Sequence, residues 1–231
     1  MQHLDLLVID QALEWARAGH SIWLCTVLST YGSAPRSPGA MLVTCGSGEY
    51  KGSLSGGCVE EEFLASLGRG EFRDIAQIVR YGEGMEECRR LQLPCGGVLV
   101  VLVEHRDPNI DWLEHLEALR AALVGQRRVL RKVNLNGGAL GLEGGIEHGS
   151  ERVQFLDDSV CIHIGPALRL ILAGISPVAE VCADIAKALG CEVIACDPRE
   201  EMLHINLDGV QMQRVLPSLF RLFAFKGVAD F

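Results

Sequence analysis

A short run of small residues, Ser55-Gly56-Gly57, places the tightest local constraint on this chain. It follows a β-rich segment and precedes apolar residues at helical spacing: Val59, Phe63, Leu64 and Leu67, with Gly68 as the stop. Glycine adopts positive φ without strain, so consecutive backbone N–H groups can converge on one point. The pattern predicts a strand, a tight turn that can hold an anion, and a helix.

Cys58 follows this turn and is predicted to lie at the helix N-terminus, where the helix dipole and free N–H groups favour a thiolate. Two effects oppose a chemical role for it. Glu60, Glu61 and Glu62 place negative charge nearby, and most cysteines in intracellular proteins are small buried hydrophobic residues. The local pattern leaves a functional thiol and a core cysteine as equal alternatives.

The overall composition argues against several classes of protein. A net charge of −9 disfavours a nucleic-acid-binding or anionic-membrane surface. The longest apolar run, residues 98–103, is too short to span a bilayer, and the start of the chain does not resemble a signal peptide. Nine cysteines, an odd and scattered set without a CxxC pair, fit reduced thiols better than disulfides or structural zinc. We therefore expect a cytoplasmic protein.

The order of the patterns predicts an α/β protein in two parts. Residues 4–18 and 109–123 are predicted helices, and residues 21–28, 40–45, 50–54 and 98–104 are predicted strands, with a hairpin at 46–48. We predict an N-terminal domain over residues 1–105, a mixed sheet with flanking helices. Residues 106–165, a connecting helix and short β segments, are predicted either to pack against this domain or to link it to a second one. His115 is predicted to lie among solvated charges and is given no role.

Two loops of the first domain carry further candidates. The loop 29–39 is rich in hydroxyl groups and holds Arg36 between two prolines, so a plain connector and a rigid anion-binding arm are both open. Cys95 precedes Gly96-Gly97 at the start of the strand 98–104. A buried cysteine in a turn is the favoured interpretation of Cys95, and a second chemical thiol is the alternative.

The last part of the chain, residues 166–231, has the plan of a dinucleotide-binding β-α-β unit. A strand ends at Gly174, a helix runs over 177–189, and the next strand ends at Asp197, which is placed for a ribose hydroxyl. Ser176 stands at the second glycine position of the motif, and Pro177 removes one N–H donor. Only about 30 residues follow this unit, so we predict a partial, truncated Rossmann-like domain. Its apolar tail, 216–226, must pack against another surface or favour association, and a homodimer is expected.

Two motifs, residues 32–41 (GSAPRSPGAM) and 55–60 (SGGCVE), together with the Cys95 element and the late β-α-β unit, resemble the XdhC/CoxI family of xanthine dehydrogenase accessory factors. The resemblance implies a non-enzymatic chaperone that binds the molybdenum cofactor, a molybdopterin. It further implies that a cysteine desulfurase sulfurates the cofactor, and that the chaperone delivers it to a xanthine dehydrogenase-type molybdenum hydroxylase.

The same resemblance assigns roles to residues. Ser55, Gly56 and Gly57 would receive the phosphate or the polar edge of the pterin through backbone N–H groups. Arg36 would pair with an anionic oxygen. The Cys58 thiolate would be a soft ligand for the metal, and Cys95 a second thiol. The predicted cofactor-binding set is completed by Glu60, Gly174 and Asp197.

Two alternatives belong to other classes of protein. An NAD(P)-dependent oxidoreductase that uses the Gly174 turn would bind NAD(P) and depend on Asp197. A pure interaction scaffold would bind no small molecule and would be indifferent to the loss of Cys58.

Overall fold

The computed structural model describes residues 4–31, 36–82, 97–124, 127–144, 152–165, 169–189, 191–202 and 204–218, and it describes the backbone but not the side chain of Cys58. The chain divides into two compact units, Asp5–Gly165 and a smaller one formed mainly by Pro166–Phe231. The larger unit combines antiparallel sheets with helices, and the smaller unit has a parallel sheet. Among the described residues, no helix is long and apolar enough to cross a membrane.

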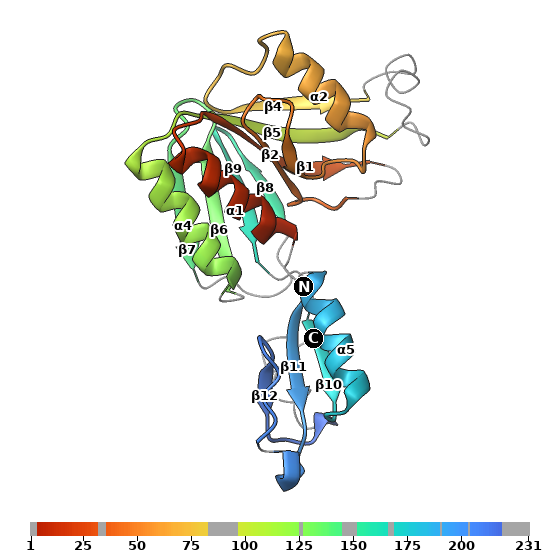
Figure 1. Ribbon diagram of the computed structural model, residues 1–231. Helices are drawn as coiled ribbons and strands as arrows, with labels where there is room; N and C mark the ends of the chain where they lie inside the picture. Colours follow the sequence, from red (N-terminus) through yellow and green to blue (C-terminus); the bar gives the residue numbers. More distant parts are fainter. Residues whose placement is uncertain are drawn as a thin grey trace. The chain divides into compact units, whose positions relative to one another are not determined.

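The first sheet of the larger unit has five strands in the order β3-β2-β1-β5-β4, and every neighbouring pair is antiparallel (Figure 1). The strands are β1 (Ile22–Thr30), β2 (Met41–Thr44), β3 (Tyr50–Gly52), β4 (Gln77–Tyr81) and β5 (Leu99–Arg106). The mixed sheet predicted for residues 1–105 is therefore wrong in its strand directions. A hairpin, such as the one between β2 and β3, reverses the chain, whereas a parallel pair needs a crossover of about a dozen residues.

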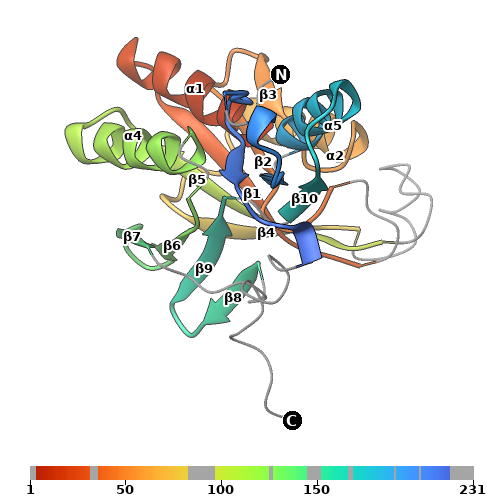
Figure 2. The same cartoon turned by 90° about the horizontal axis from the view of Figure 1, so that it is seen from below.

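The two faces of this sheet are covered by different helices. Because side chains alternate along a strand, Leu24 of β1 faces one core while Cys25 faces the other. The first core is shared with α1 (Leu4–Arg17) and α4 (Ile110–Val124), which lie side by side (Figure 2). The second core is closed by Val59 and Phe63 of α2 (Cys58–Gly68). The sheet is thus buried on both faces.

The stretch 106–165, predicted either to pack against the first domain or to link it to the next, belongs to the core of the larger unit. Beside α4 it forms a second antiparallel sheet in the order β7-β6-β9-β8. Its strands are β6 (Val129–Asn134), β7 (Leu140–Gly144), β8 (Val153–Leu156) and β9 (Ser159–Ile164). Val133 and Ile162 are fully buried in the same core as Leu24. Val129 and Val133 of β6 lie on one face of the strand, and this apolar face has to be covered, so the second sheet packs in the same core as the first.

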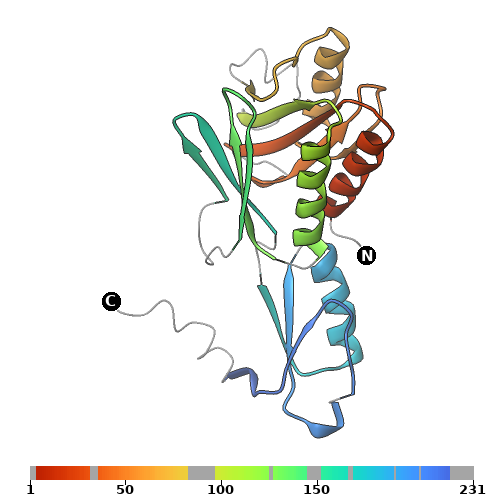
Figure 3. The ribbon, with the colours of Figure 1, turned by 90° about the vertical axis from the view of Figure 1, so that its left-hand side faces the viewer.

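The smaller unit contains a β-α-β arrangement, as predicted. Its parallel sheet has the order β10-β11-β12, with α5 packed against β10 and β11 (Figure 3). The elements are β10 (Arg169–Ala173), α5 (Pro177–Ala188), β11 (Glu192–Cys196), the 3-10 turn η1 (Glu200–Met202) and β12 (Gln211–Gln213). Ser176 caps α5, since its Oγ accepts from the N–H of Ala179 at 3.2 Å.

Candidate functional site

The turn between β3 and α2 encloses the carboxylate of Glu60. One carboxylate oxygen, Oε1, accepts from Ser53 Oγ at 2.7 Å and from the N–H groups of Leu54 at 2.8 Å, Ser55 at 3.0 Å and Gly56 at 3.2 Å. The other, Oε2, accepts from Ser55 Oγ at 2.5 Å and from the N–H of Gly57 at 3.0 Å. The predicted convergence of N–H groups is present, and in this structure the anion at its centre belongs to the chain itself.

The hydroxyl groups of the turn are oriented by further bonds. Ser53 Oγ accepts from the N–H of Gly56 at 3.0 Å, and Ser55 Oγ accepts from the N–H of Val59 at 2.9 Å. Each hydroxyl has a single proton and directs it to Glu60. The carboxylate, the two serines and the first turn of α2 therefore form one connected network.

Glycine is required at two kinds of position here. Gly56 and Gly57 have φ values of +90° and +135°, in the region that residues with a Cβ rarely adopt. Gly52 has φ +97°, and a Cβ at this position would lie 2.2 Å from the carbonyl oxygen of Met41 and 2.6 Å from Val8 Cγ2. The turn can therefore approach β2 and α1 only because residue 52 has no side chain.

The environment keeps Glu60 ionised. Its side chain is only 1% exposed. Burial alone would raise the pKa of this carboxyl, but hydrogen bonds from the side chain and backbone of Ser55 and from the side chain of Ser53 lower the pKa to about 2. At neutral pH the turn consequently holds a full negative charge that is compensated by hydrogen-bond donors.

The sheet brings the loops of the first domain toward the same end. Leu42, near the start of β2, pairs with Gly52 at the end of β3, and the N–H of Ser53 donates to the carbonyl of Met41 at 3.1 Å. Because β1 is antiparallel to both β2 and β5, its last residue, Thr30, pairs with Leu99 at the start of β5. The segment around Arg36, the turn 53–57 and the segment that precedes β5 therefore leave the sheet at one end.

Arg36 has the character expected of an anion-binding residue. Its side chain is half-buried, and its Nε atom is buried without a hydrogen-bond partner in the described part of the chain. The loop behind it is anchored, since Arg152 donates to the carbonyl of Pro38 at 3.3 Å and to that of Gly165 at 3.1 Å. An unpaired guanidinium N–H on an anchored loop can donate a hydrogen bond to an anionic ligand without losing an existing one.

Of the two predicted thiols, only Cys58 has a described backbone, and the side chain of neither is described. Cys58 begins α2, with Gly57 as its N-cap residue, so its backbone is at the predicted helix N-terminus. Cys95 lies outside the described residues. Within those residues there is no group of three or more His, Cys, Asp or Glu side chains that could hold a metal ion.

In the smaller unit, Asp197 bonds to its own chain. Its carboxylate is 4% exposed. It accepts from the N–H of Ile175 at 2.8 Å, from the N–H and Nε of Arg199, both at 3.0 Å, and from Arg199 Nη2 at 2.7 Å. These bonds, chiefly that with the Arg199 side chain, hold the pKa of Asp197 well below its usual range. Asp197 thus joins the turn after Gly174 to the end of β11, at the place predicted for a ribose.

A buried polar cluster in the larger unit was missed by sequence reasoning. Arg131 of β6 forms a bidentate ion pair with Glu104 of β5 at 2.6 and 3.0 Å, and Arg106 Nη2 reaches the same carboxylate at 3.0 Å. His115 accepts from Arg131 Nε at 2.9 Å and stacks on Trp112. His115 is therefore half-buried in this cluster, and the prediction that it lies among solvated charges is wrong. The only available signal was charged residues placed within apolar strands.

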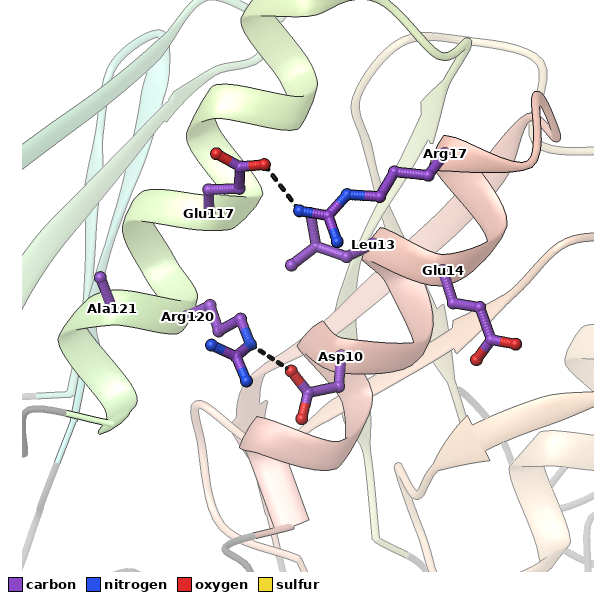
Figure 4. Close-up of a pocket in the computed structure, with 7 residues that line it drawn as sticks. All are labelled: Asp10, Leu13, Glu14, Arg17, Glu117, Arg120 and Ala121. Carbon is purple, nitrogen blue, oxygen red and sulfur yellow. Dashed lines mark hydrogen bonds and ion pairs between the residues drawn. The ribbon is translucent and has the colours of Figure 1, made fainter.

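A groove between α1 and α4 is lined by charged side chains (Figure 4). Two ion pairs cross it, Arg17 with Glu117 at 2.7 Å and Arg120 with Asp10 at 2.6 Å. All four side chains are partly exposed, so each pair contributes little to stability. None of the predicted site residues lines this groove.

The fold defines an α/β protein of two units, with a candidate site at the glycine-rich turn that precedes Cys58. Comparison with known proteins shows which family has this combination. Residues 15–82 match the model of the XdhC and CoxI family, which confirms the predicted resemblance over the stretch that contains both motifs. The molybdenum cofactor insertion chaperone PaoD of Escherichia coli (strain K12) is 38% identical over 94 residues. That alignment covers 39% of this chain and 28% of PaoD.

A solved structure shows a similar fold over the whole chain. It is described as a xanthine dehydrogenase from Bacillus halodurans, and the two structures superpose with a TM-score of 0.56. The match covers 100% of this chain and 72% of the other, with 19% sequence identity. At that identity the likeness concerns the fold.

Proposed function

We propose that this chain is an accessory factor that binds the molybdenum cofactor and delivers it to a xanthine dehydrogenase-type molybdenum hydroxylase in the cytoplasm. One observation carries the proposal. The family match over residues 15–82 includes Arg36 and the turn 53–60, and the sheet register brings these two segments to the same end of one sheet. The relative named as a molybdenum cofactor insertion chaperone supports the same assignment.

The residues present fit an anionic, sulfur-rich cargo. Arg36 offers a buried nitrogen that has no hydrogen-bond partner among the described residues, which suits a phosphate or another oxyanion of the cofactor. Cys58 begins a helix, where a thiolate is favoured, and a thiolate is a soft ligand suited to a metal that is already bound to sulfur. Cys95 would act as a second thiol. In this proposal the chain binds and shields the cofactor but turns over no metabolite itself.

Two finer steps belong to the same proposal. Sulfuration of the cofactor by a cysteine desulfurase would take place while the cargo is bound, since a chaperone that holds the metal centre can present it to the sulfur donor. A homodimer would place two copies of the site in one assembly.

The test uses protein purified anaerobically from cells that make the molybdenum cofactor. We expect wild-type protein to carry pterin, measured by fluorescence after oxidation, and molybdenum, whereas Cys58→Ala and Arg36→Ala lose both. Cys182→Ala is the matched control, because Cys182 is an exposed cysteine of the smaller unit. Soluble, folded wild-type protein without pterin, or full loading of Cys58→Ala, would contradict the proposal.

An NAD(P)-dependent oxidoreductase remains the alternative, because the smaller unit has the β-α-β arrangement and Gly174 has φ +96°. It predicts NAD(P) binding by the wild-type chain that Asp197→Ala weakens, measured by calorimetric titration. Arg199→Ala is the informative companion, since it breaks the internal ion pair but leaves the carboxylate free for a ribose. No binding at millimolar cofactor would eliminate this alternative.

A further inference from the structure

We propose that Glu60 is a positioning residue: its carboxylate is the permanent anion of the turn 53–57, and it holds the backbone from which Cys58 begins α2. The inference rests on the proposed function in one respect, that Cys58 contacts the cofactor. It also changes the role assigned to Glu60, from a cofactor ligand to a group that shapes the ligand site.

The geometry leaves no donor of the turn unused. Both oxygens of Glu60 are engaged, by six hydrogen bonds from five consecutive residues. Four of the donors are backbone N–H groups, and these are the groups that would otherwise receive a phosphate. An oxyanion of the cargo therefore has no free N–H group among residues 54–57, and Arg36 is the predicted partner that keeps a donor for it.

Glu60 is tied to Cys58 by position as well as by contact. It is the third residue of α2, and its Oε2 accepts from the N–H of Gly57, the N-cap residue. Such a bond is one half of a capping box, which stabilises the first turn of a helix. Cys58 lies between these two bonded residues, so the bond fixes the backbone on both sides of it.

The neighbouring glutamates cannot take over this role. Glu61 is exposed, and Glu62 points to Arg69, whose Nη2 lies 3.2 Å from its Oε1. Glu61 therefore supplies a control substitution that removes the same charge from the same helical turn without touching the network.

The substitution Glu60→Ala creates a specific defect. It removes the anion and leaves a small cavity lined by hydrogen-bond donors, which is a site for a one-carbon carboxylate such as formate. A group needed only for bulk or helix propensity would leave no such site. Formate has a neutral isostere, formamide, which separates charge from size.

The experiment uses the full chain as wild type, Glu60→Ala and Glu61→Ala. Alkylation of Cys58 by iodoacetamide at one fixed pH is followed by peptide mass spectrometry. We expect the alkylation rate of Glu60→Ala to differ about tenfold from that of wild type, since the start of α2, which governs the access and thiolate character of Cys58, frays once hydrogen bonds to a charged group are lost. We expect formate, but not formamide, to restore the rate to within about twofold of wild type. Glu61→Ala should react like wild type and ignore formate.

Pterin content gives the second readout and separates this inference from the proposed function. Glu60→Ala should be purified without cofactor, and formate added during loading should restore it. Formate-restored alkylation without pterin in any variant, wild type included, would uphold the role of Glu60 and overturn the cofactor assignment. Normal pterin and unchanged alkylation in Glu60→Ala would overturn the role of Glu60 and leave the cofactor assignment standing.

If Glu60→Ala does not fold, a measurement on the wild-type protein tests the role of Glu60 instead. Amide hydrogen exchange measured by NMR should show the N–H groups of Leu54, Ser55, Gly56 and Gly57 protected in the native state, because each donates to Glu60. Rapid exchange of these four amides in a folded chain would overturn the proposal.

Discussion

Two carboxylates, those of Glu60 and Asp197, show how the hydrogen-bond donors around a residue determine its role. Both were predicted to contact a cofactor, and both accept bonds from turns of their own chain: Glu60 from residues 53–57 and Asp197 from Ile175 and Arg199. A carboxylate beside several free N–H groups will satisfy them itself when its tether allows, because an intramolecular partner has a high effective concentration. In both turns, therefore, these donors are already bonded to a carboxylate of the same chain.

His115 leads to a prediction about pH. Burial, and then the charges of Arg131 and Arg106, lower its pKa from 6.5 to about 3. Between these values the unfolded chain binds a proton that the folded chain does not, so the free energy of unfolding decreases as the pH falls through this window. The decrease is at most about 1.4 kcal/mol per pH unit.

The variant His115→Gln keeps an acceptor for Arg131 Nε but does not titrate. Between pH 7 and pH 5, urea denaturation should show the wild type losing about 1–2 kcal/mol more stability than this variant. His20→Gln changes an exposed histidine and should leave the pH dependence of the wild type intact. Identical pH dependence for wild type and His115→Gln would contradict the assigned environment.

At the scale of elements, the two sheets and α4 meet around the charged cluster. Glu104 is on β5, Arg131 on β6, and His115 and Trp112 on α4, so each element contributes a polar partner to one buried point. Arg106 and Arg131 also lie over the ring of Trp112, at 5.5 and 6.0 Å from its centroid. These directional contacts favour one register between the two sheets, whereas apolar packing alone tolerates several.

Ion pairs of two kinds allow a matched comparison. Arg131→Ala removes the main partner of Glu104, which is fully buried, and should cost about 3–5 kcal/mol in the free energy of unfolding. Arg120→Ala breaks a partly exposed pair between α1 and α4 and should cost less than about 1 kcal/mol. Urea denaturation of both variants measures the difference. Equal costs would show that Glu104 is not buried as the structure has it.

At the scale of the whole molecule, the two units bury unequal amounts of apolar surface, and we expect their stabilities to differ accordingly. Among the described residues, two large clusters of buried residues lie within Asp5–Gly165, whereas the buried cluster of the smaller unit contains Val193, Val210 and three alanines, with partly buried residues such as Leu170 packed against it. Because hydrophobic stabilisation scales with the apolar area buried, the larger unit should fold independently of the smaller one.

All three tryptophans, Trp15, Trp23 and Trp112, lie in the larger unit, so their fluorescence reports on that unit alone. A chain that ends at Gly165 should give the same fluorescence transition in urea as the full chain. Val193→Asp, in the core of the smaller unit, should leave this transition unchanged, whereas Val101→Asp should abolish it. A transition that shifts with Val193→Asp would show that the two units unfold together.

Local patterns predicted most of the elements. The helix expected over 4–18 is α1 (Leu4–Arg17), the helix expected over 109–123 is α4 (Ile110–Val124), and the hairpin at 46–48 joins β2 and β3. The β-α-β order of the smaller unit was also readable. These features depend on spacing, turn residues and caps, which act over a few neighbouring residues.

What the sequence by itself determined was therefore the glycine turn before α2, the family motifs that surround it, and the order of the elements. Only the tertiary structure decided that the first sheet is antiparallel, that residues 106–165 share its core, and that His115 meets Arg131. It also decided that Glu60 is the anion in the turn. The physical reason is that burial and hydrogen-bond partners depend on which segments meet in space, and residues such as Glu104 and Arg131 are far apart in the chain.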